Sequence, residues 1–94
     1  MLHWNTLEFE WDEEKSRLNY LKHGIRFETA THIFEDEDRM EFYDEAHSSE
    51  EDRYQTIGMV NKILFVVYTE RNDRIRLISA REATPMERRI YHDR

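Results

Sequence analysis

The stretch RYQTIGMVNKILFVVYTERNDRIRLISA, residues 53–80, decides the fold. It predicts three antiparallel strands, at Arg53–Val60, Ile63–Glu70 and Arg74–Ala80. Asn61-Lys62 and Asn72-Asp73 are two-residue connectors of turn-forming residues, so both joints are predicted to be tight hairpins. The run Ile63–Tyr68 is almost continuously apolar, which indicates a central strand that is covered on both faces.

Two such turns predict a register for the three strands. In the first hairpin Val60 then pairs with Ile63, and Arg53 with Glu70. In the second hairpin Arg71 pairs with Arg74, so Glu70 lies opposite Ile75 and Leu64 lies opposite Arg81. The face that helices should cover carries Ile57, Met59, Leu64, Val66, Ile75 and Leu77. The open face carries Tyr54, Thr56, Gly58, Phe65, Val67, Thr69, Arg74, Arg76 and Ile78. Because the open face is aromatic and cationic, we expect this face to be the one that can contact RNA.

Outward from this core, the N-terminal segment predicts a strand and a helix. Leu7–Trp11 alternates between apolar and acidic residues, as a half-buried strand does. Asp12 can cap a helix over residues 13–23, and Gly24 can end it. At 100° per residue, Leu18 and Leu21 mark its expected inward side. A separate polar stripe on its flank contains Lys15, Asn19, Lys22 and His23.

The remaining segments complete one α+β domain over residues 1–94. A second, shorter helix is expected over residues 28–34, with Phe27, Ala30, Ile33 and Phe34 facing the core. Residues 39–44 alternate as a strand, and an acidic loop follows at 45–52. Thr84-Pro85-Met86-Glu87 predicts a capping box and a closing helix over 85–91. The expected fold is an antiparallel sheet of about four strands with a short N-terminal strand, two N-terminal helices and one C-terminal helix.

Composition excludes several classes of function. The 94 residues include no cysteine and only two glycines, so thiolate metal sites and glycine-rich phosphate loops are excluded. The five histidines, at 3, 23, 32, 47 and 92, lack the close spacing of a helical metal site. We therefore expect no cofactor and no metal. No apolar run reaches the roughly 20 residues of a membrane span, and the acidic residues Glu8 and Glu10 argue against a signal peptide. A cytoplasmic protein without membrane contact is expected.

Charge is unevenly distributed along the chain, whose net charge is −7. Residues 71–94 hold seven arginines against four acidic residues, whereas residues 1–70 hold seven basic and 17 acidic residues. Ten of the eighteen residues at 35–52 are Asp or Glu. A small domain with this polarity can offer a local basic surface while its far side stays acidic. A solvated acidic loop and an arginine-rich tail without a partner would give the same pattern.

The arginines point to phosphate chemistry. A guanidinium group stays charged, binds phosphate through two hydrogen bonds and stabilises a pentacoordinate phosphorus. RNA cleavage needs little besides this: a base near the 2′-hydroxyl and a proton donor for the 5′-oxygen. Candidates for these roles are His23, Tyr68, Arg71, Arg76, Arg81 and Tyr91. Each also has a structural alternative: Tyr68 can pack in the core, His23 can cap helix carbonyls, Arg53 can form an ion pair with Glu70, and Arg88 and Arg89 can complement the dipole of the closing helix.

Several segments together resemble one protein family. They are Phe9-Glu10-Trp11-Asp12-Glu13, Lys22-His23-Gly24, Phe27-Glu28, His47-Ser48, Glu51-x-Arg53, Ile57-Gly58, Val67-Tyr68-Thr69-Glu70-Arg71, Ile75-Arg76, Ile78-Ser79-Ala80-Arg81, Ala83-Thr84, Glu87-Arg88 and Tyr91. In this order they resemble the BrnT toxins of bacterial type II toxin–antitoxin pairs. The blocks span residues 9–91, and it is their ordered set that is specific.

The resemblance implies a RelE-like fold and a metal-independent endoribonuclease that inhibits translation by cutting RNA. It also implies an antitoxin, BrnA, that neutralises the toxin and through which the complex binds promoter DNA. By that pattern, Arg81 and Tyr91 resemble the late arginine–tyrosine pair of RelE-like nucleases, and Arg71 or Arg76 the earlier arginine. In a regular hairpin Arg71 pairs with Arg74, which lies seven residues before Arg81, so Arg71 and Arg81 lie roughly 23 Å apart at about 3.3 Å per residue. We therefore expect Arg76, which lies between them, to be the central phosphate contact.

The sequence thus predicts an endoribonuclease toxin with Arg71, Arg76, Arg81, His23 and Tyr91 at its catalytic site. RNA binding is assigned to Lys15, Lys22, Arg53, Arg74 and Arg89. A non-catalytic module that binds the antitoxin and acts as a co-repressor is the alternative, with the acidic segment 35–52 as docking surface for a basic partner. A third alternative is a housekeeping RNA-processing protein without an antitoxin.

Overall fold

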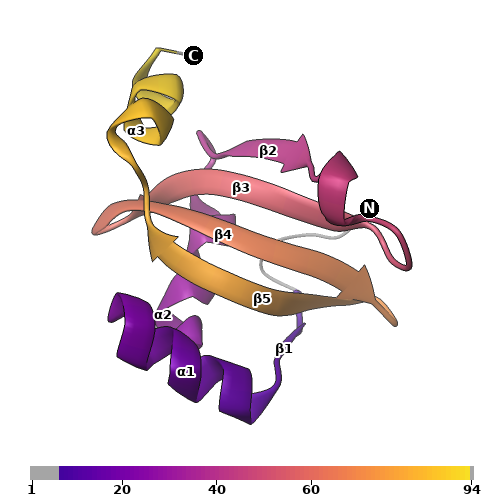
Figure 1. Cartoon of the computed structure of the whole chain (residues 1–94). Coiled ribbons are helices and arrows are strands. Elements are labelled where there is room, and N and C mark those ends of the chain that lie inside the picture. Colours follow the sequence, from indigo (N-terminus) through magenta and orange to yellow (C-terminus); the bar gives the residue numbers. More distant parts are fainter. Residues whose placement is uncertain (1–6, 94) are drawn as a thin grey trace.

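The computed structural model describes residues 7–93; His3 and Arg94 lie outside that range, as do the other residues at 1–6. The elements, in chain order, are β1 (Phe9–Glu10), α1 (Glu13–His23), α2 (Phe27–Ala30), the 3₁₀ helix η2 (Thr31–Glu35), β2 (Met40–Tyr43), the 3₁₀ helix η3 (Glu45–His47), β3 (Arg53–Val60), β4 (Lys62–Arg71), β5 (Arg74–Glu82) and α3 (Pro85–His92). In the described range, the strands form one sheet in the order β1-β5-β4-β3-β2. Figure 1 shows α1 and α2 on one side of this sheet and α3 on the other.

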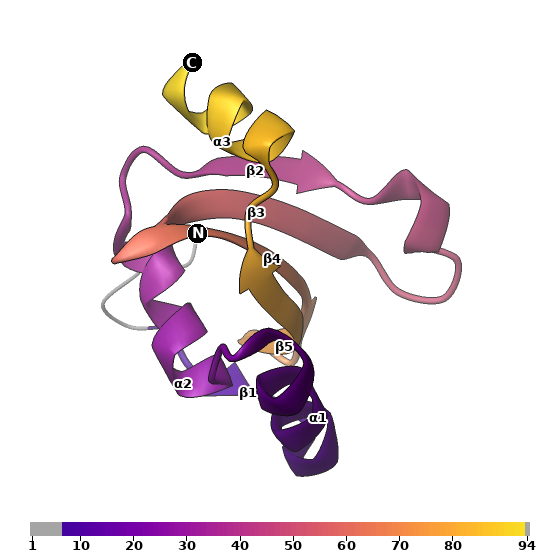
Figure 2. The ribbon, with the colours of Figure 1, turned by 60° about the vertical axis from the view of Figure 1, so that its left-hand side comes forward.

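The fold is α+β, as predicted, but two details differ. The sheet has five strands and is mixed, because the short β1 runs parallel to β5 while the other pairs are antiparallel. The second N-terminal helix is a single α-helical turn, α2, that continues as the 3₁₀ helix η2. Thr31 and Ile33 are β-branched, which disfavours a longer α-helix here. In the view of Figure 2, α2 lies beside β1 at the end of the sheet opposite α3.

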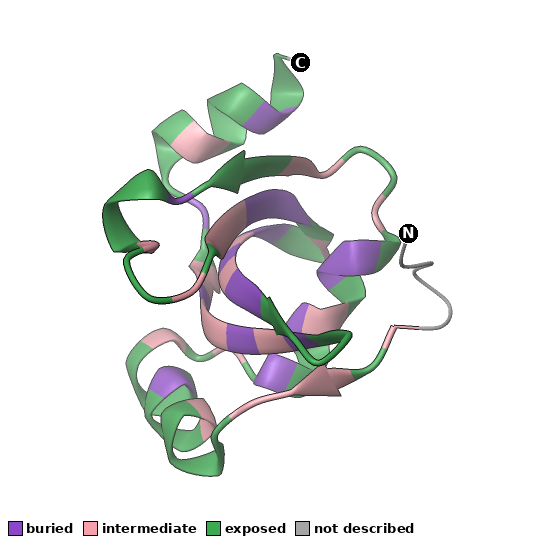
Figure 3. Ribbon diagram, turned by 90° about the vertical axis from the view of Figure 1, so that its right-hand side faces the viewer, coloured by how far each residue is buried: buried purple, intermediate pink, exposed green. Residues whose placement is uncertain are grey.

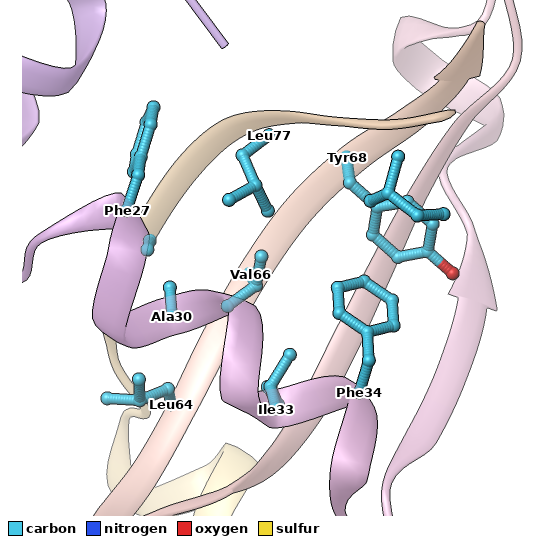
Figure 4. Close-up of a cluster of buried hydrophobic side chains, with 10 residues drawn as sticks. Phe27, Ala30, Ile33, Phe34, Leu64, Val66, Tyr68 and Leu77 are labelled. Atoms are coloured by element: carbon cyan, nitrogen blue, oxygen red, sulfur yellow. The ribbon is translucent and has the colours of Figure 1, made fainter. Parts of the chain in front are cut away.

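The core lies between the sheet and the α2–η2 segment, as expected from the sequence. Phe27, Ala30 and Ile33 of this segment are fully buried against Val66 and Leu77 of the sheet. Figure 4 shows these side chains facing one another, with the ring of Tyr68 beside that of Phe34. Tyr68 is 3% exposed and therefore belongs to the core, as its structural alternative predicted.

The predicted register of the β3–β4 hairpin is wrong by one residue. Val60 pairs with Lys62 instead of Ile63, because Asn61 alone makes the reversal with a left-handed φ of 61°. A slip of one residue exchanges the two faces of a strand. Ile57 consequently packs beneath α3, together with Tyr91. Tyr54, Thr56 and Gly58, which we expected on the open face, share the helix-covered face with Leu64, Val66 and Tyr68; Met59 moves to the α3 side with Ile57.

The same shift removes the predicted ion pair between Arg53 and Glu70, since Arg53 lies opposite Thr69. In the β4–β5 hairpin the turn is as predicted: Arg71 pairs with Arg74, and Glu70 with Ile75. An irregularity between Val67 and Tyr68 then shifts the register. As a result, Arg81 lies opposite Phe65, and Leu64 lies opposite Glu82 instead of Arg81.

The helix α1 turns the opposite side to the sheet from the one predicted. Leu18 and Leu21 are 50% and 67% exposed, while Asn19 is the buried residue of the helix. Figure 3 shows α1 coloured almost entirely as exposed. The core below the sheet is already filled by α2 and η2, so α1 docks through polar bonds at the sheet edge. No helix in the described range is long and apolar enough to cross a membrane.

Candidate nucleic-acid interface

The polar stripe of α1 begins and ends at well-defined helix caps. The Asp12 carboxylate accepts a hydrogen bond from the Lys15 backbone N–H at 2.9 Å, as an N-cap residue does. Gly24 adopts a left-handed φ of 71°, and its N–H donates to the Tyr20 carbonyl at 2.8 Å. These caps place Lys22 and His23 in the last turn of the helix, where cations are favoured.

Asn19 attaches this helix to the edge of β5. Its amide nitrogen donates to the Ala80 carbonyl at 2.9 Å and to the Ile25 carbonyl at 3.0 Å, and its amide oxygen accepts from the Ala80 N–H at 3.0 Å. Because β1 pairs with β5 only at Ile75 and Arg76, the edge of β5 at Ala80 has no strand beside it. The amide of Asn19 satisfies the backbone there as a neighbouring strand would.

A groove of about 220 Å³ lies between α1 and β5. It is lined by Lys15, Leu18, Asn19, Lys22, His23, Ile78 and Ser79. Three of the predicted site residues, Lys15, Lys22 and His23, are therefore brought together. No carboxylate of residues 7–93 forms an ion pair with the ammonium group of Lys15 or Lys22. The groove is thus a local cationic surface on a chain that is acidic as a whole.

His23 is held close to its neutral form by this environment. Its partial burial removes water from the imidazolium, and the positive charges of Lys22 and Arg81 oppose a further charge. All three effects lower the pKa of His23 below its ordinary value. A neutral imidazole at the end of a cationic groove is able to accept a proton at neutral pH.

Arg81 is fixed in position by the N-terminus of α3. Its guanidinium forms two hydrogen bonds with the Glu87 carboxylate, at 2.8 and 3.0 Å, and lies 4.1 Å from the centre of the Phe65 ring. Glu87 also completes the predicted capping box with Thr84. Burial would raise the pKa of Glu87, but the hydrogen bonds from Arg81 and Thr84 outweigh it and lower that pKa. The Arg81 side chain remains 32% exposed.

The other arginines of the β4–β5 hairpin that were predicted to form the site are also paired with carboxylates. Arg76 donates to Glu10 at 2.9 Å, Arg74 to Glu8 at 3.2 Å, and Arg71 to Glu51 at 3.0 Å. We had expected free guanidinium groups on the open face. Instead, Glu10 of β1 and Glu8 just before it are acidic partners of two of them, since the parallel pairing of β1 with β5 sets Glu10 beside Arg76.

The remaining predicted site residues are dispersed. Tyr91 lies on the buried side of α3, where its hydroxyl donates to Asp36 at 2.6 Å. Arg53 lies on β3 and Arg89 in the last turn of α3. Arg88 donates to the Ala83 carbonyl at 3.0 Å. None of these residues lines the groove between α1 and β5.

Comparison with known proteins identifies the family of this chain and a similar crystal structure. A family model described as "Ribonuclease toxin, BrnT, of type II toxin-antitoxin system" matches residues 11–87. This chain belongs to the BrnT family. The crystal structure of the Brucella abortus ribonuclease toxin BrnT is similar to it, with a TM-score of 0.67 and 27% sequence identity over 84% of this chain and 99% of that one. No curated protein sequence matches.

Two other features bear on the choice of site in this BrnT-family chain. A larger hollow of about 570 Å³ is lined in part by Glu28, Glu35 and Asp36, whose charges repel phosphate. Within residues 7–93, no group of three or more His, Asp or Glu side chains is arranged to hold a metal ion. The α1–β5 groove is therefore the better candidate for a nucleic acid.

Two residues that line this groove, Asn19 and Ser79, had no functional role in the interpretation of the sequence. Ile78, which also lines it, was expected on the open face of the sheet. A signal for Asn19 did exist: an asparagine in mid-helix costs helix stability and therefore suggests a tertiary bond. Nothing in the sequence indicates that it contacts Ala80, 61 positions away.

Proposed function

We propose that this chain is a metal-independent endoribonuclease that cuts RNA in the α1–β5 groove and thereby inhibits translation in the cytoplasm. The observation that carries the proposal is His23, whose pKa is lowered by burial and by the neighbouring cations Lys22 and Arg81. A base that is neutral beside groups that bind phosphate is the arrangement that cleavage by the 2′-hydroxyl requires. Membership of a family described as ribonuclease toxins supports it.

The cleavage step follows from these groups. Neutral His23 accepts the proton of a ribose 2′-hydroxyl, and the 2′-oxygen forms a bond to the adjacent phosphorus. Lys15, Lys22 and Arg81 hydrogen-bond the phosphate oxygens, whose charge grows in the pentacoordinate state. The bond from phosphorus to the 5′-oxygen then breaks, and that oxygen takes a proton from an ammonium group of the groove. The products carry a 2′,3′-cyclic phosphate and a 5′-hydroxyl.

Arg76 lies further along β5, outside the residues that line the groove. It lies opposite Thr69, and Arg81 lies opposite Phe65, so both arginines project from the same face of β5, on either side of Ser79. A strand of RNA that follows β5 meets both. Their partners Glu10 and Glu87 hold the guanidinium groups in place while the side chains of Arg76 and Arg81 stay 28% and 32% exposed. We keep Arg76 as a phosphate contact, and assign Arg74, Arg71, Arg53 and Arg89 to weaker electrostatic attraction.

The test is cleavage of a defined RNA by the purified chain in the presence of EDTA. Wild type should produce ends with a 2′,3′-cyclic phosphate, His23→Gln should lose at least about a hundredfold in rate, and Arg76→Ala should also lose activity. His32→Gln is the matched control, because His32 lies on the acidic hollow instead. Full activity of His23→Gln, or cleavage abolished by EDTA, contradicts the mechanism.

The pairing of four arginines with carboxylates favours a second candidate. Arginines whose charge is neutralised by carboxylates bind phosphate less strongly. In that case the chain is a non-catalytic module that binds the antitoxin and acts as a co-repressor. Expression without the antitoxin separates the two functions. Growth arrest with new RNA ends supports the nuclease, whereas harmless expression with tighter promoter binding by the antitoxin supports the module.

We further propose that a BrnA-like antitoxin neutralises this chain by direct binding and that the complex binds promoter DNA through the antitoxin. The support is the family's description as part of type II toxin–antitoxin systems. Co-expression should restore growth, and gel-shift assays with promoter DNA should require the antitoxin.

A further inference from the structure

The exposed leucines of α1 have no function in holding the helix. Leu18 and Leu21 are 50% and 67% exposed, although they are the apolar residues one would expect a helix to bury. The amide of Asn19 bonds α1 to β5 without them. They lie three positions apart and so form one continuous apolar strip on the helix surface.

This leucine strip is the outer rim of the groove. At 100° per residue, Lys15 and Lys22 lie between Asn19, which faces the sheet, and Leu18. Leu18 itself lines the groove. Leu21 does not line it, and by helical spacing it lies further from Asn19 than Leu18 does. An occupant that packs on both leucines therefore lies across the mouth of the groove and over its cations.

We propose that the leucine strip, Leu18 and Leu21, is the docking surface for the antitoxin, which binds it through an amphipathic segment with apolar residues flanked by Asp or Glu. The apolar residues cover the two leucines, and the acidic ones pair with Lys15 and Lys22, which have no carboxylate partner among residues 7–93. This inference rests on the proposed function, because binding at the leucine strip inhibits RNA cleavage only if the groove that it covers is the nuclease site.

Neither a basic protein nor RNA fits this surface as well. A basic partner would be drawn to the acidic segment 35–52, which contributes nothing to the groove. RNA would use the lysines but has little need of a leucine that projects away from the groove floor. The combination of two exposed leucines with two lysines that have no ion-pair partner in the described part of the chain favours an acidic, partly apolar protein segment.

The test measures the affinity of the protein encoded beside the toxin gene for variants of the full chain. Leu21→Glu should weaken binding at least tenfold, since it removes an apolar contact and sets a negative charge against acidic residues. Met86→Glu is the matched control, because Met86 is also 67% exposed but lies on α3. It should bind as wild type does. Both substitutions are at exposed helix positions, and thermal melts confirm that each variant folds.

A second variant tests the partner's charge. Lys15→Gln combined with Lys22→Gln should weaken antitoxin binding several-fold. Unchanged binding overturns the proposal, and tighter binding overturns it and identifies a basic partner. Equal affinities of wild type and Leu21→Glu, or equal losses in Leu21→Glu and Met86→Glu, also overturn it. RNA cleavage by Leu21→Ala, which introduces no charge at the rim of the groove, should match wild type, and a loss of cleavage in this variant with normal antitoxin binding would assign the strip to RNA. If wild type cleaves no RNA yet the binding pattern holds, only the proposed nuclease function fails.

Discussion

Replacing Asn19 should destabilise this protein more than replacing either leucine of the same helix. Asn19→Ala removes three hydrogen bonds at 2.9–3.0 Å and leaves both the N–H and the C=O of Ala80 without a partner. Asn19 is 8% exposed, so water replaces these bonds poorly. Leu21→Ala, by contrast, removes atoms that are already in water.

The magnitude follows from the cost of unsatisfied backbone groups. Each buried donor or acceptor that loses its partner costs about 1–3 kcal/mol. Two groups at Ala80, partly relieved by water entering from the groove, give a loss of about 2–4 kcal/mol in the free energy of unfolding. For a domain of this size that corresponds to a fall in melting temperature of roughly 10–20 °C. Leu21→Ala should change the free energy of unfolding by less than about 0.5 kcal/mol.

The assay is urea denaturation followed by circular dichroism, with thermal melts of the same variants. Asn19→Asp adds a second comparison: it keeps an acceptor for the Ala80 N–H but cannot donate to the Ala80 and Ile25 carbonyls, and its charge would face them. It should therefore be at least as destabilising as Asn19→Ala. If Asn19→Ala loses less stability than Leu21→Ala, α1 is not held through its amide and the description of the groove fails.

Three further predictions concern the site and the fold. Lys22→Ala should raise the pKa of His23 toward its ordinary value, because one repelling charge is gone; an NMR titration that compares wild type with His23→Gln to identify the signal measures this. Since the pKa of His23 is lower in the folded chain than in the unfolded one, its contribution favours folding above about pH 6.5 and is lost as pH falls through the folded pKa. Stability curves from pH 7 to 4 should be flatter over that window in His23→Gln, and an unchanged slope would contradict the shift. Gly58→Ala should cost about 1–3 kcal/mol by urea denaturation, because its added Cβ would lie 2.6 Å from Ile33 Cγ1, whereas a loss below 0.5 kcal/mol would show that Ile33 moves aside without cost.

Much of the local structure could be predicted from the sequence. The limits of β3 and the caps of α1 agree with the prediction, and the capping box of α3 is present as expected. These features depend on residues that are close in the chain, such as Asp12 with Lys15 and Thr84 with Glu87. The family could also be recognised, because the order of its motifs is a property of the sequence.

The candidate site was predicted in part. Lys15, Lys22 and His23 were grouped by helical spacing, and the structure brings them together against β5. The pairing of the arginines with Glu8, Glu10, Glu51 and Glu87 was not predicted, although strand register and the family resemblance were used to choose among them. Three of these carboxylates lie more than ten positions from their arginine, beyond the reach of any local pattern.

Local residue patterns were therefore enough to predict the approximate positions of the helices and strands, the segments that are apolar enough for the core, and the family that the motifs resemble. The tertiary structure alone decided which way α1 faces and which side of β3 lies beneath α3. The reason is physical: a one-residue difference at Asn61 exchanges the faces of a strand, and a single amide at Asn19 satisfies a strand edge 61 positions away. Neither choice has a local energetic signature, because each depends on backbone groups that become neighbours only after folding.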